Sequence, residues 1–340
     1  MSQMSETRQS VTETFPGKMA VCGKGTAMNC DRLEERQALF QKLGGLSEAL
    51  VSNSEWLYML QEDTRQSLAI EGYFATQDDL DAILKGGKTA LEVSNYFRIA
   101  QTTYDLGLQY HRDQASIPLD LSVVRHIHSE LFRGLDDNRG TFRVSPIQIH
   151  GAKIKPPEFD IPAYMQAALT ITRHALSRLP VFQALARVHT LFESVHPFHD
   201  GNGRAGRILL NYLAISQGYP PIVIKGVASE ERARYYQALE AADSGLQQGW
   251  PDPTPEKLEE RLNEGDFAPL EQLLCDGVSP RLDTLTILAM EAREPLMDLA
   301  DVAVQFGITE AAVRQRIQRG RLLAIKRGKK LYSHPQLALS

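Results

Sequence analysis

The twelve residues from His196 to Arg207 bring together the side chains of this 340-residue chain that are best suited to chemistry: His-Pro-Phe-His-Asp-Gly-Asn-Gly-Arg-Ala-Gly-Arg. A Gly-Asn-Gly turn that opens a helix presents free backbone N–H groups, and the helix dipole favours an anion there. Arg204 and Arg207 lie three positions apart on that helix, so both guanidinium groups can approach one polyanion. Asp200 is an oxygen ligand of the kind that Mg²⁺ prefers beside phosphates, and His196 titrates near neutral pH. The stretch therefore predicts transfer of a phosphate-linked group to a nucleophile.

This stretch resembles the signature of the Fic-domain family, His-x-Phe-x-(Asp/Glu)-Gly-Asn-Gly-Arg-x-x-Arg, and it fills every fixed position. The resemblance implies an all-α core with one small β-hairpin flap over about residues 35–292. It also implies a protein adenylyltransferase, which moves AMP from ATP to a Tyr, Thr or Ser hydroxyl of a protein, itself included. In that reaction His196 is the catalytic base that takes the hydroxyl proton, and Asp200 holds Mg²⁺.

The resemblance also implies which residues bind the nucleotide. The N–H groups of the Gly201–Gly203 turn cradle the phosphates, Arg204 neutralises the leaving pyrophosphate, and Arg207 binds the γ-phosphate. A tyrosine pair borders the adenosine, although at least one of the two rings is expected in the core. The implied nucleotide-binding residues are Glu71, Ile147, Gln148, Ile149, His150, His196, Gly201, Asn202, Gly203, Arg204, Ala205, Gly206, Arg207, Tyr235 and Tyr236.

A second motif precedes the first by more than a hundred residues. Ser67 and Glu71 are four positions apart at the end of a predicted helix, so they share one face, and Gly72 follows as a helix-ending residue. By itself the pair indicates a solvated helix end, although a Glu in the last turn is slightly unfavourable with the helix dipole. Ser67-x-x-x-Glu71-Gly72 is similar to the inhibitory motif of Fic proteins in which that motif precedes the core. The resemblance implies that Glu71 pairs with Arg207 and occupies the guanidinium meant for the γ-phosphate.

Short alternating runs between residues 140 and 157 surround His150-Gly151 and predict a β-hairpin. A lone hairpin in a helical protein is marginal unless it is packed or used. The resemblance implies that this hairpin is the flap, whose edge holds a target protein by strand addition. The alternative is an excursion without a function.

The histidines near the motif raise the possibility of a zinc site at His196, His199 and Asp200. Pro197 and the glycines break the helical spacing there and no fourth ligand is evident, so a zinc site is disfavoured. His128, His189 and His199 are expected to have structural roles.

The C-terminal residues are basic, whereas the rest of the chain is acidic. Residues 309–340 hold eight Lys and Arg and one Glu, a formal charge of +7. Since the whole chain carries −5, residues 1–308 carry −12. Two short helices around Gly307, with Thr309 as N-cap of the second, predict a helix-turn-helix, and Leu323–Leu331 predicts a wing that turns at Gly328. The expected DNA-binding residues are Arg314, Arg316, Arg319, Lys326 and Arg327. A packing or protein-binding role is the alternative.

The expected organisation is a disordered tail (1–30), N-terminal helices with the inhibitory motif (31–115), the Fic core (116–250), a helical connector (251–294) and the winged helix-turn-helix domain (295–340). Helical periodicity is clearest over residues 54–70, 90–113 and 181–195. No apolar run reaches the ~18–20 residues of a membrane span, and no signal peptide is evident. Three scattered cysteines, Cys22, Cys30 and Cys275, suit a cytoplasmic protein and suggest no special role. The expected partners are a target protein at the flap and DNA, with no membrane, and a homodimer is compatible with this organisation.

Three other functions remain open from the sequence. The same scaffold can transfer another nucleotide or phosphocholine. It can also remove AMP from modified proteins, with Glu71 helping to position water. Finally, the chain can be a DNA-binding regulator whose core is only a sensor, which the intact motif argues against, since a sensor need not keep both His196 and Arg207.

Overall fold

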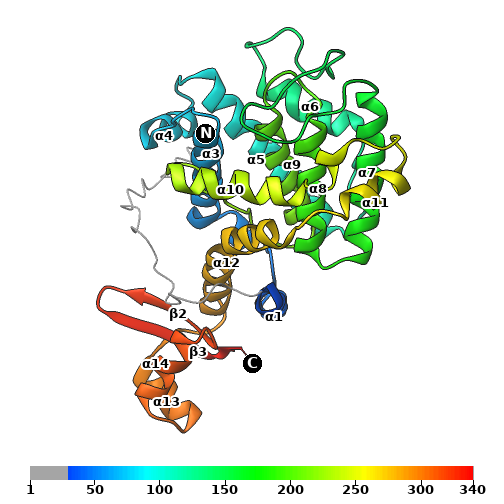
Figure 1. Cartoon of the computed structure of the whole chain (residues 1–340). Coiled ribbons are helices and arrows are strands. Elements are labelled where there is room, and N and C mark those ends of the chain that lie inside the picture. Colours follow the sequence, from blue (N-terminus) through cyan, green and yellow to red (C-terminus); the bar gives the residue numbers. More distant parts are fainter. Residues whose placement is uncertain (1–29, 340) are drawn as a thin grey trace, which may run out of the picture.

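The structure, a computed structural model, describes residues 30–339, so the tail expected at residues 1–30 lies outside the described residues apart from its last position. Helices make up most of the described chain, and its one small sheet lies near the C-terminus (Figure 1). The expected all-α fold class is therefore confirmed. Among the described helices, none combines the length and the apolar character that crossing a membrane requires.

Short connections join most of the helices. In chain order they are α1 (Cys30–Lys42), α2 (Glu48–Val51), α3 (Ser54–Ile70), α4 (Gln77–Leu84), α5 (Leu91–Arg112), α6 (Leu121–Leu131), α7 (Ile161–Arg178), α8 (Val181–Val195), α9 (Asn202–Ser216), α10 (Ser229–Ala242), the 3-10 helix η1 (Leu246–Gln248), α11 (Pro255–Leu262), α12 (Ala268–Glu291), α13 (Leu299–Phe306) and α14 (Glu310–Gln318). The strands are β1 (Met297–Asp298), β2 (Leu322–Arg327) and β3 (Lys330–Ala338).

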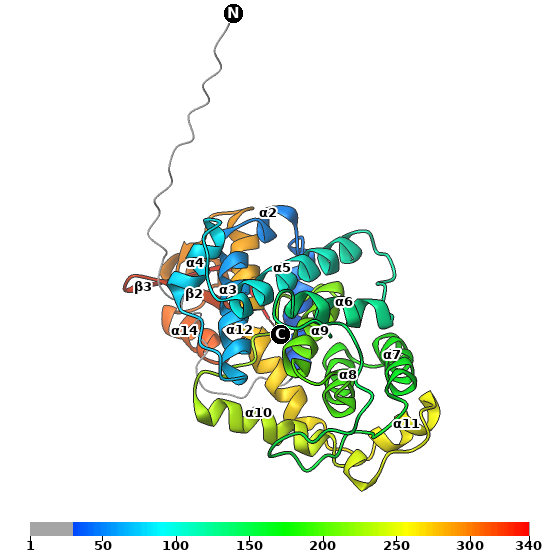
Figure 2. The same cartoon turned by 90° about the horizontal axis from the view of Figure 1, so that it is seen from above.

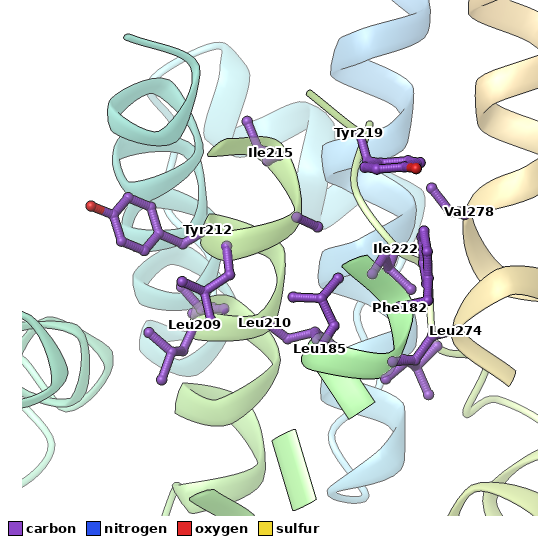
Figure 3. Close-up of a cluster of buried hydrophobic side chains, with 14 of the residues drawn as sticks. Phe182, Leu185, Leu209, Leu210, Tyr212, Ile215, Tyr219, Ile222, Leu274 and Val278 are labelled. Carbon is purple, nitrogen blue, oxygen red and sulfur yellow. The ribbon is translucent and has the colours of Figure 1, made fainter. Parts of the chain in front are cut away.

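Helix α9 is the centre of the core. Nearly every one of its residues is buried, and it packs against α5, α6 and α8 (Figures 1 and 2). Leu210 on α9 points towards Leu185 on α8, whereas Leu209 and Tyr212 point to the other side of α9 (Figure 3). Leu274 on α12 belongs to the same apolar cluster. Gly107 lets α5 approach closely, because a Cβ there would lie 3.0 Å from the carbonyl oxygen of Tyr212. The helix that begins with the motif is thus held on several sides.

Helix α12 differs from the sequence expectation. The periodicity predicts separate helices at 267–274 and 282–291, but one helix runs from Ala268 to Glu291 through Pro280. Proline inside a helix costs about 3 kcal/mol. Burial compensates here, because α12 packs against α1, α8 and α10 and also against the C-terminal sheet. Helix α12 therefore contacts both the helical core and the C-terminal sheet. Cys275 on this helix is buried and disulfide-bonded, so the expectation of no special role is wrong for it.

The expected β-hairpin flap at residues 140–157 is wrong in detail. The structure has a turn at His150-Gly151, where the N–H of Ala152 donates to the Ile149 carbonyl, but no strand within this segment. Pro146, Pro156 and Pro157 supply no N–H groups for a ladder. The segment is instead an extended loop held by side chains, and Trp250, for example, donates from Nε1 to the Lys155 carbonyl at 2.6 Å. We keep the name flap for residues 140–157.

The C-terminal unit contains the elements that the sequence predicts there. Helix α13 ends at Gly307, which has a φ of 63°, and Thr309 caps α14 by accepting from the N–H of Ala312. Strands β2 and β3 are antiparallel around Gly328, and β1 joins on the other side of β3, in the order β1-β3-β2. Two helices and a strand pair are thus present, and their use in DNA binding stays a prediction.

Charged side chains dock this unit onto the core. Arg36 on α1 forms a buried ion pair with Asp283 on α12, with 2.8 Å between Nε and Oδ1, and its Nη2 donates to the Gly320 carbonyl at 3.4 Å. Arg327 on β2 forms a bidentate pair with Glu291 at the end of α12. Helix α1 therefore touches both α12 and the C-terminal unit (Figure 1).

Candidate active site

His196 ends helix α8 in a left-handed conformation, with a φ of 50°. Its ring Nδ1 lies 3.1 Å from the carbonyl oxygen of Glu193, and a carbonyl can only accept, so Nδ1 carries the proton. Burial lowers the pKa of His196, partly offset by its bond to the Glu193 carbonyl, and this favours the neutral ring. The remaining nitrogen, Nε2, is left without a proton. His196 is therefore prepared to accept one.

The glycine turn before α9 adopts the geometry of an anion cradle. Gly201 is the N-cap with a φ of 76°, and α9 begins at Asn202, so the first N–H groups of a long helix face outwards. The Asn202 side chain, predicted as part of the cradle, instead holds the loop: its amide exchanges two hydrogen bonds of 2.8 Å with the backbone of Phe198. Its side-chain amide is therefore engaged within the loop, and its role in binding phosphates stays a prediction.

The small residues of the motif make room for acidic neighbours. A Cβ on Gly203 would lie 2.3 Å from Oε1 of Glu71, and one on Gly206 would lie 2.1 Å from Oε1 of Glu193. Ala205 is buried in the core. A side chain at either position would therefore push against these acids, and also against Arg207 at Gly203 and Phe192 at Gly206.

Arg204 and Asp200 form a pair at the mouth of the site. Nη2 of Arg204 lies 3.1 Å from Oδ2 of Asp200, whose Oδ1 accepts from the N–H of Gly201 at 2.6 Å. The guanidinium of Arg204 is buried between the rings of Tyr73 and Phe132, and its Nε has no hydrogen-bond partner among residues 30–339. A buried cationic donor without a partner is costly, so an anion bound close to this guanidinium would be favoured.

Asp200 also fits a magnesium ion. Its carboxylate is 68% exposed, and the described residues contain no cluster of three or more His, Cys, Asp or Glu that could hold a metal. Mg²⁺ bound with a nucleotide commonly takes one or two carboxylates and completes its shell with phosphates and water. A single exposed carboxylate beside an arginine matches that pattern. A depression of about 220 Å³ opens beside it, lined by His199 and by flap residues that include Phe142 and Val144.

Arg207 is buried and bonds to residues of the inhibitory motif. Its Nε donates to Oγ of Ser67 at 2.7 Å, and its Nη2 donates to Oε1 of Glu71 at 2.7 Å and to the Ser67 carbonyl at 3.1 Å. Burial alone would lower the pKa of Arg207, but the Glu71 carboxylate raises it above its ordinary value. Glu71 follows the last residue of α3, and Gly72 turns the chain away with a φ of 84°. The structure therefore brings together the two motifs that the sequence linked only by resemblance.

Further contacts anchor α3, and sequence reasoning missed them. The side-chain oxygen of Gln66 accepts from the N–H groups of Gly226 and Val227. The carboxylate of Asp63 is buried and accepts from the hydroxyls of Tyr96 and Tyr104. Lone polar residues at helical spacing carry no signal for partners 33 to 161 positions away.

The two tyrosines of α10 have different positions. Tyr235 is buried, and its hydroxyl lies 2.7 Å from Nε2 of His189, so it belongs to the core. Burial lowers the pKa of His189 to about 3 and raises that of Glu193, one turn later, to about 8. Tyr236 is 49% exposed and donates to the carbonyl of Ile70 at 3.2 Å, so it contacts the end of α3 beside the site.

The four flap residues that the resemblance assigns to nucleotide binding stay a prediction. Ile147, Gln148, Ile149 and His150 are exposed or half-buried, and no hydrogen bond joins their side chains to residues 196–207 in the described chain. The flap is tied to the site by Arg143, whose Nε donates to the His196 carbonyl at 2.8 Å. Sequence reasoning missed this residue as well.

Comparisons with known proteins agree with this geometry. The model of the Fic/DOC family matches residues 118–214. A probable protein adenylyltransferase of Aquifex aeolicus is 32% identical over 189 residues, which cover 55% of this chain and 56% of the relative. The protein adenylyltransferase Fic of Drosophila persimilis is 27% identical over 274 residues, 76% of this chain and 48% of the relative. The chain thus spans about half the length of the curated relatives it matches.

Solved structures share the fold. A Fic-domain-containing signalling protein from Bacteroides thetaiotaomicron superposes with a TM-score of 0.63 at 20% identity, covering 76% of this chain and 97% of that one. A Fic family protein from Desulfovibrio desulfuricans covers 92% of this chain and 97% of its own, with a TM-score of 0.51 and 20% identity. Residues 118–214, which carry the complete motif, therefore match the Fic/DOC family, and the described chain shares its fold with a solved Fic-domain protein.

Proposed function

We propose that this chain is a protein adenylyltransferase that transfers AMP from ATP to a Tyr, Thr or Ser hydroxyl of a protein, including its own chain. One observation carries the proposal. A histidine with an unprotonated Nε2 lies at the end of α8, and the anion cradle and two buried arginines begin α9 directly afterwards. Relatives named protein adenylyltransferase support the same activity.

The residues divide the reaction between them. Nε2 of His196 takes the proton of the acceptor hydroxyl, whose oxygen forms a bond to the α-phosphorus while the bond to the β-phosphate oxygen breaks and pyrophosphate leaves. Arg204 and the first N–H groups of α9 neutralise charge on the phosphates. Asp200 would hold Mg²⁺, which when bound offsets further phosphate charge. The target segment would lie along the flap.

We further propose that the pair between Glu71 and Arg207 keeps the enzyme inhibited. A γ-phosphate that binds Arg207 must displace the Glu71 carboxylate, and the two anions would repel each other at that distance. ATP then binds in a pose that does not present its α-phosphorus to the acceptor. Activity would require α3 to withdraw or Glu71 to rotate away.

Radiolabelled ATP tests the proposed activity. The chain with Glu71→Gly should incorporate label from α-³²P-ATP into protein and none from γ-³²P-ATP. Label from the γ position would contradict AMP transfer and indicate a kinase. Transfer from GTP, CTP, UTP or CDP-choline in place of ATP would favour another group on the same scaffold. Loss of AMP from previously labelled protein, dependent on Glu71, would favour removal.

A second function, DNA binding, rests on the C-terminal unit. The exposed side chains of Arg319, Lys326, Lys329 and Lys330 give one part of the molecule a strong positive charge. Two of the expected DNA contacts are engaged within the chain instead, since Arg314 pairs with Glu310 and Arg327 with Glu291. Arg316 stacks on the Phe306 ring.

Fluorescence anisotropy with a labelled duplex of random sequence tests this second function. The combined change Lys326→Gln, Lys329→Gln and Lys330→Gln should weaken binding and make the slope of log K against log salt shallower by about 3. Lys85→Gln with Lys88→Gln, on the surface of the core, is the control. Absence of binding at low salt would leave a packing or protein-binding role, and a sensor without transferase activity would bind DNA and label nothing.

A further inference from the structure

His128 on α6 contacts the motif although it lies far from it in sequence. Its side chain is buried, and its Nε2 lies 3.0 Å from the carbonyl oxygen of Asp200, 72 positions later. Its Nδ1 accepts from the N–H of Gly140, at the base of the flap, at 2.9 Å. One ring therefore joins α6, the flap and the loop that carries Asp200.

The two bonds define the tautomer of this ring. A backbone N–H can only donate, so Nδ1 of His128 is the acceptor, and Nε2 carries the proton that it donates to the Asp200 carbonyl. Aromatic rings fix both faces of the imidazole. Phe198 stacks at 3.8 Å between centroids with an interplanar angle of 8°, and Phe132 stacks at 4.6 Å.

Both partners of His128 have little freedom. Gly140 has a φ of 72°, its carbonyl accepts from Nε of Arg125 at 2.7 Å, and a Cβ there would lie 2.9 Å from the Arg125 carbonyl oxygen. On the other side, a Cβ on Gly201 would lie 2.3 Å from the Phe132 ring. The turn at Asp200-Gly201 therefore rests on a surface made by His128 and Phe132, and of these two rings His128 is the one that donates a hydrogen bond to it.

We propose that His128 is a positioning residue of the candidate active site: it holds the Asp200 carbonyl, and thereby aims the Asp200 carboxylate at the place where a magnesium ion of a bound nucleotide would lie. This role rests on the proposed adenylyl transfer. It explains why a histidine occupies a core position between two phenylalanines, where an apolar residue would pack as well. A misplacement of about 1 Å at such a site can cost about 10²-fold in rate.

Two substitutions with amide side chains test the two hydrogen bonds of the His128 ring separately. In His128→Gln the side-chain amide nitrogen can reach the position of Nε2 and donate to the Asp200 carbonyl. In His128→Asn the side-chain oxygen takes the position of Nδ1, so the bond from Gly140 stays while the bond to Asp200 is lost. His126→Asn, on the exposed side of the same helix, is the matched control.

The variants are made in the Glu71→Gly background, and AMP transfer and ATP binding are both measured. We expect the Gln variant to stay within a few-fold of its parent and the Asn variant to lose about 10²-fold in transfer rate. The Asn variant should also lose the gain in ATP affinity that Mg²⁺ produces over EDTA, with its affinity in EDTA unchanged. Equal losses of transfer rate in the Gln and Asn variants would overturn the proposal. So would an Asn variant whose ATP affinity still rises with Mg²⁺ as much as that of its parent.

The unmutated chain supplies a readout that does not depend on folding of a variant. Two-bond ¹H–¹⁵N spectra of the histidine rings should show the His128 proton on Nε2, and a proton on Nδ1 would overturn the proposal. If the Glu71→Gly parent transfers no AMP, the proposed function fails. The role of His128 is then still decided by two measurements, the rise in ATP affinity with Mg²⁺ and the tautomer of the His128 ring.

Discussion

Nη2 of Arg207 lies 2.7 Å from Oε1 of Glu71, although the two residues are 136 positions apart in the chain. The guanidinium is 3% exposed and the carboxylate 29%, so solvent reaches the pair only from the side of Glu71. That asymmetry suits a contact in which the arginine is fixed and the acid is the part that leaves.

Replacing Glu71 with Gly should raise AMP labelling roughly 10- to 100-fold, because a charge-assisted hydrogen bond contributes about 1.5–3 kcal/mol. Glu71→Gln, which keeps an acceptor but no charge, should give an intermediate rate. Initial rates with α-³²P-ATP measure the effect, and Asp78→Gly, an exposed acid on α4, is the control. An unchanged rate would remove Glu71 from regulation.

Replacing His196 with Ala in the activated background should lower AMP transfer by about 10²–10⁴-fold, the usual contribution of a positioned base. ATP affinity should change little, since the phosphate contacts come from α9. Single-turnover rates and isothermal calorimetry separate the two effects. Undiminished labelling would assign the base to another residue.

The parts of this site that are contiguous in sequence were predictable. His196 to Arg207 lie in one loop and one helix, so their types and spacing carry the geometry, and the helices expected over 54–70, 90–113 and 181–195 form as α3, α5 and α8. The inhibitory pair was found only through resemblance, because nothing local to Glu71 indicates Arg207. The incorrect strand prediction in the flap also arises from contacts that are distant in sequence. Alternation at residues 140–157 indicated strands, but Arg143 within this segment bonds to the carbonyls of Val195 and His196, about fifty positions away, and local alternation carries no sign of those partners.

Arg143 offers a test of how the flap is held. Its buried guanidinium donates to four carbonyls, those of Ser145, Pro157, Val195 and His196, and so also caps the C-terminus of α8. Arg143→Met should lower the free energy of unfolding by about 3 kcal/mol or more, since each buried acceptor left without a donor costs about 1–3 kcal/mol.

Urea denaturation measures the loss in the Arg143 variant, and Arg139→Met, exposed four residues earlier, is the control. Arg143→Lys should recover only part of the stability, because one ammonium group cannot reproduce a planar fork. Wild-type stability in the Met variant would show that water satisfies these carbonyls.

Asp63 should make stability depend on pH. Burial raises its pKa from 3.8 to about 6, against the lowering effect of the Tyr104 and Tyr96 hydroxyls. Between those two pH values the folded chain holds one more proton than the unfolded chain, so this contribution to stability falls as pH rises from about 4 to 6 and is constant above. The total is about 3 kcal/mol.

Asp63→Asn cannot titrate, so the change in its unfolding free energy between pH 4 and 7 should differ from that of the wild type by about this amount. Urea titrations at four pH values measure it, with Asp78→Asn as the control, and other raised carboxyl groups cancel in the comparison. Parallel curves for the wild type and the Asn variant would contradict the assignment.

The ion pair between Arg36 and Asp283 has a consequence for how the chain is assembled on the ribosome. Its partners are separated by 247 positions, and Leu33 and Phe40 on the same helix are fully buried, with α12 among the elements that α1 contacts. During synthesis α1 therefore emerges long before α12, and its docking cannot be complete until Asp283 has followed. The first described helix is thus among the last to find its place.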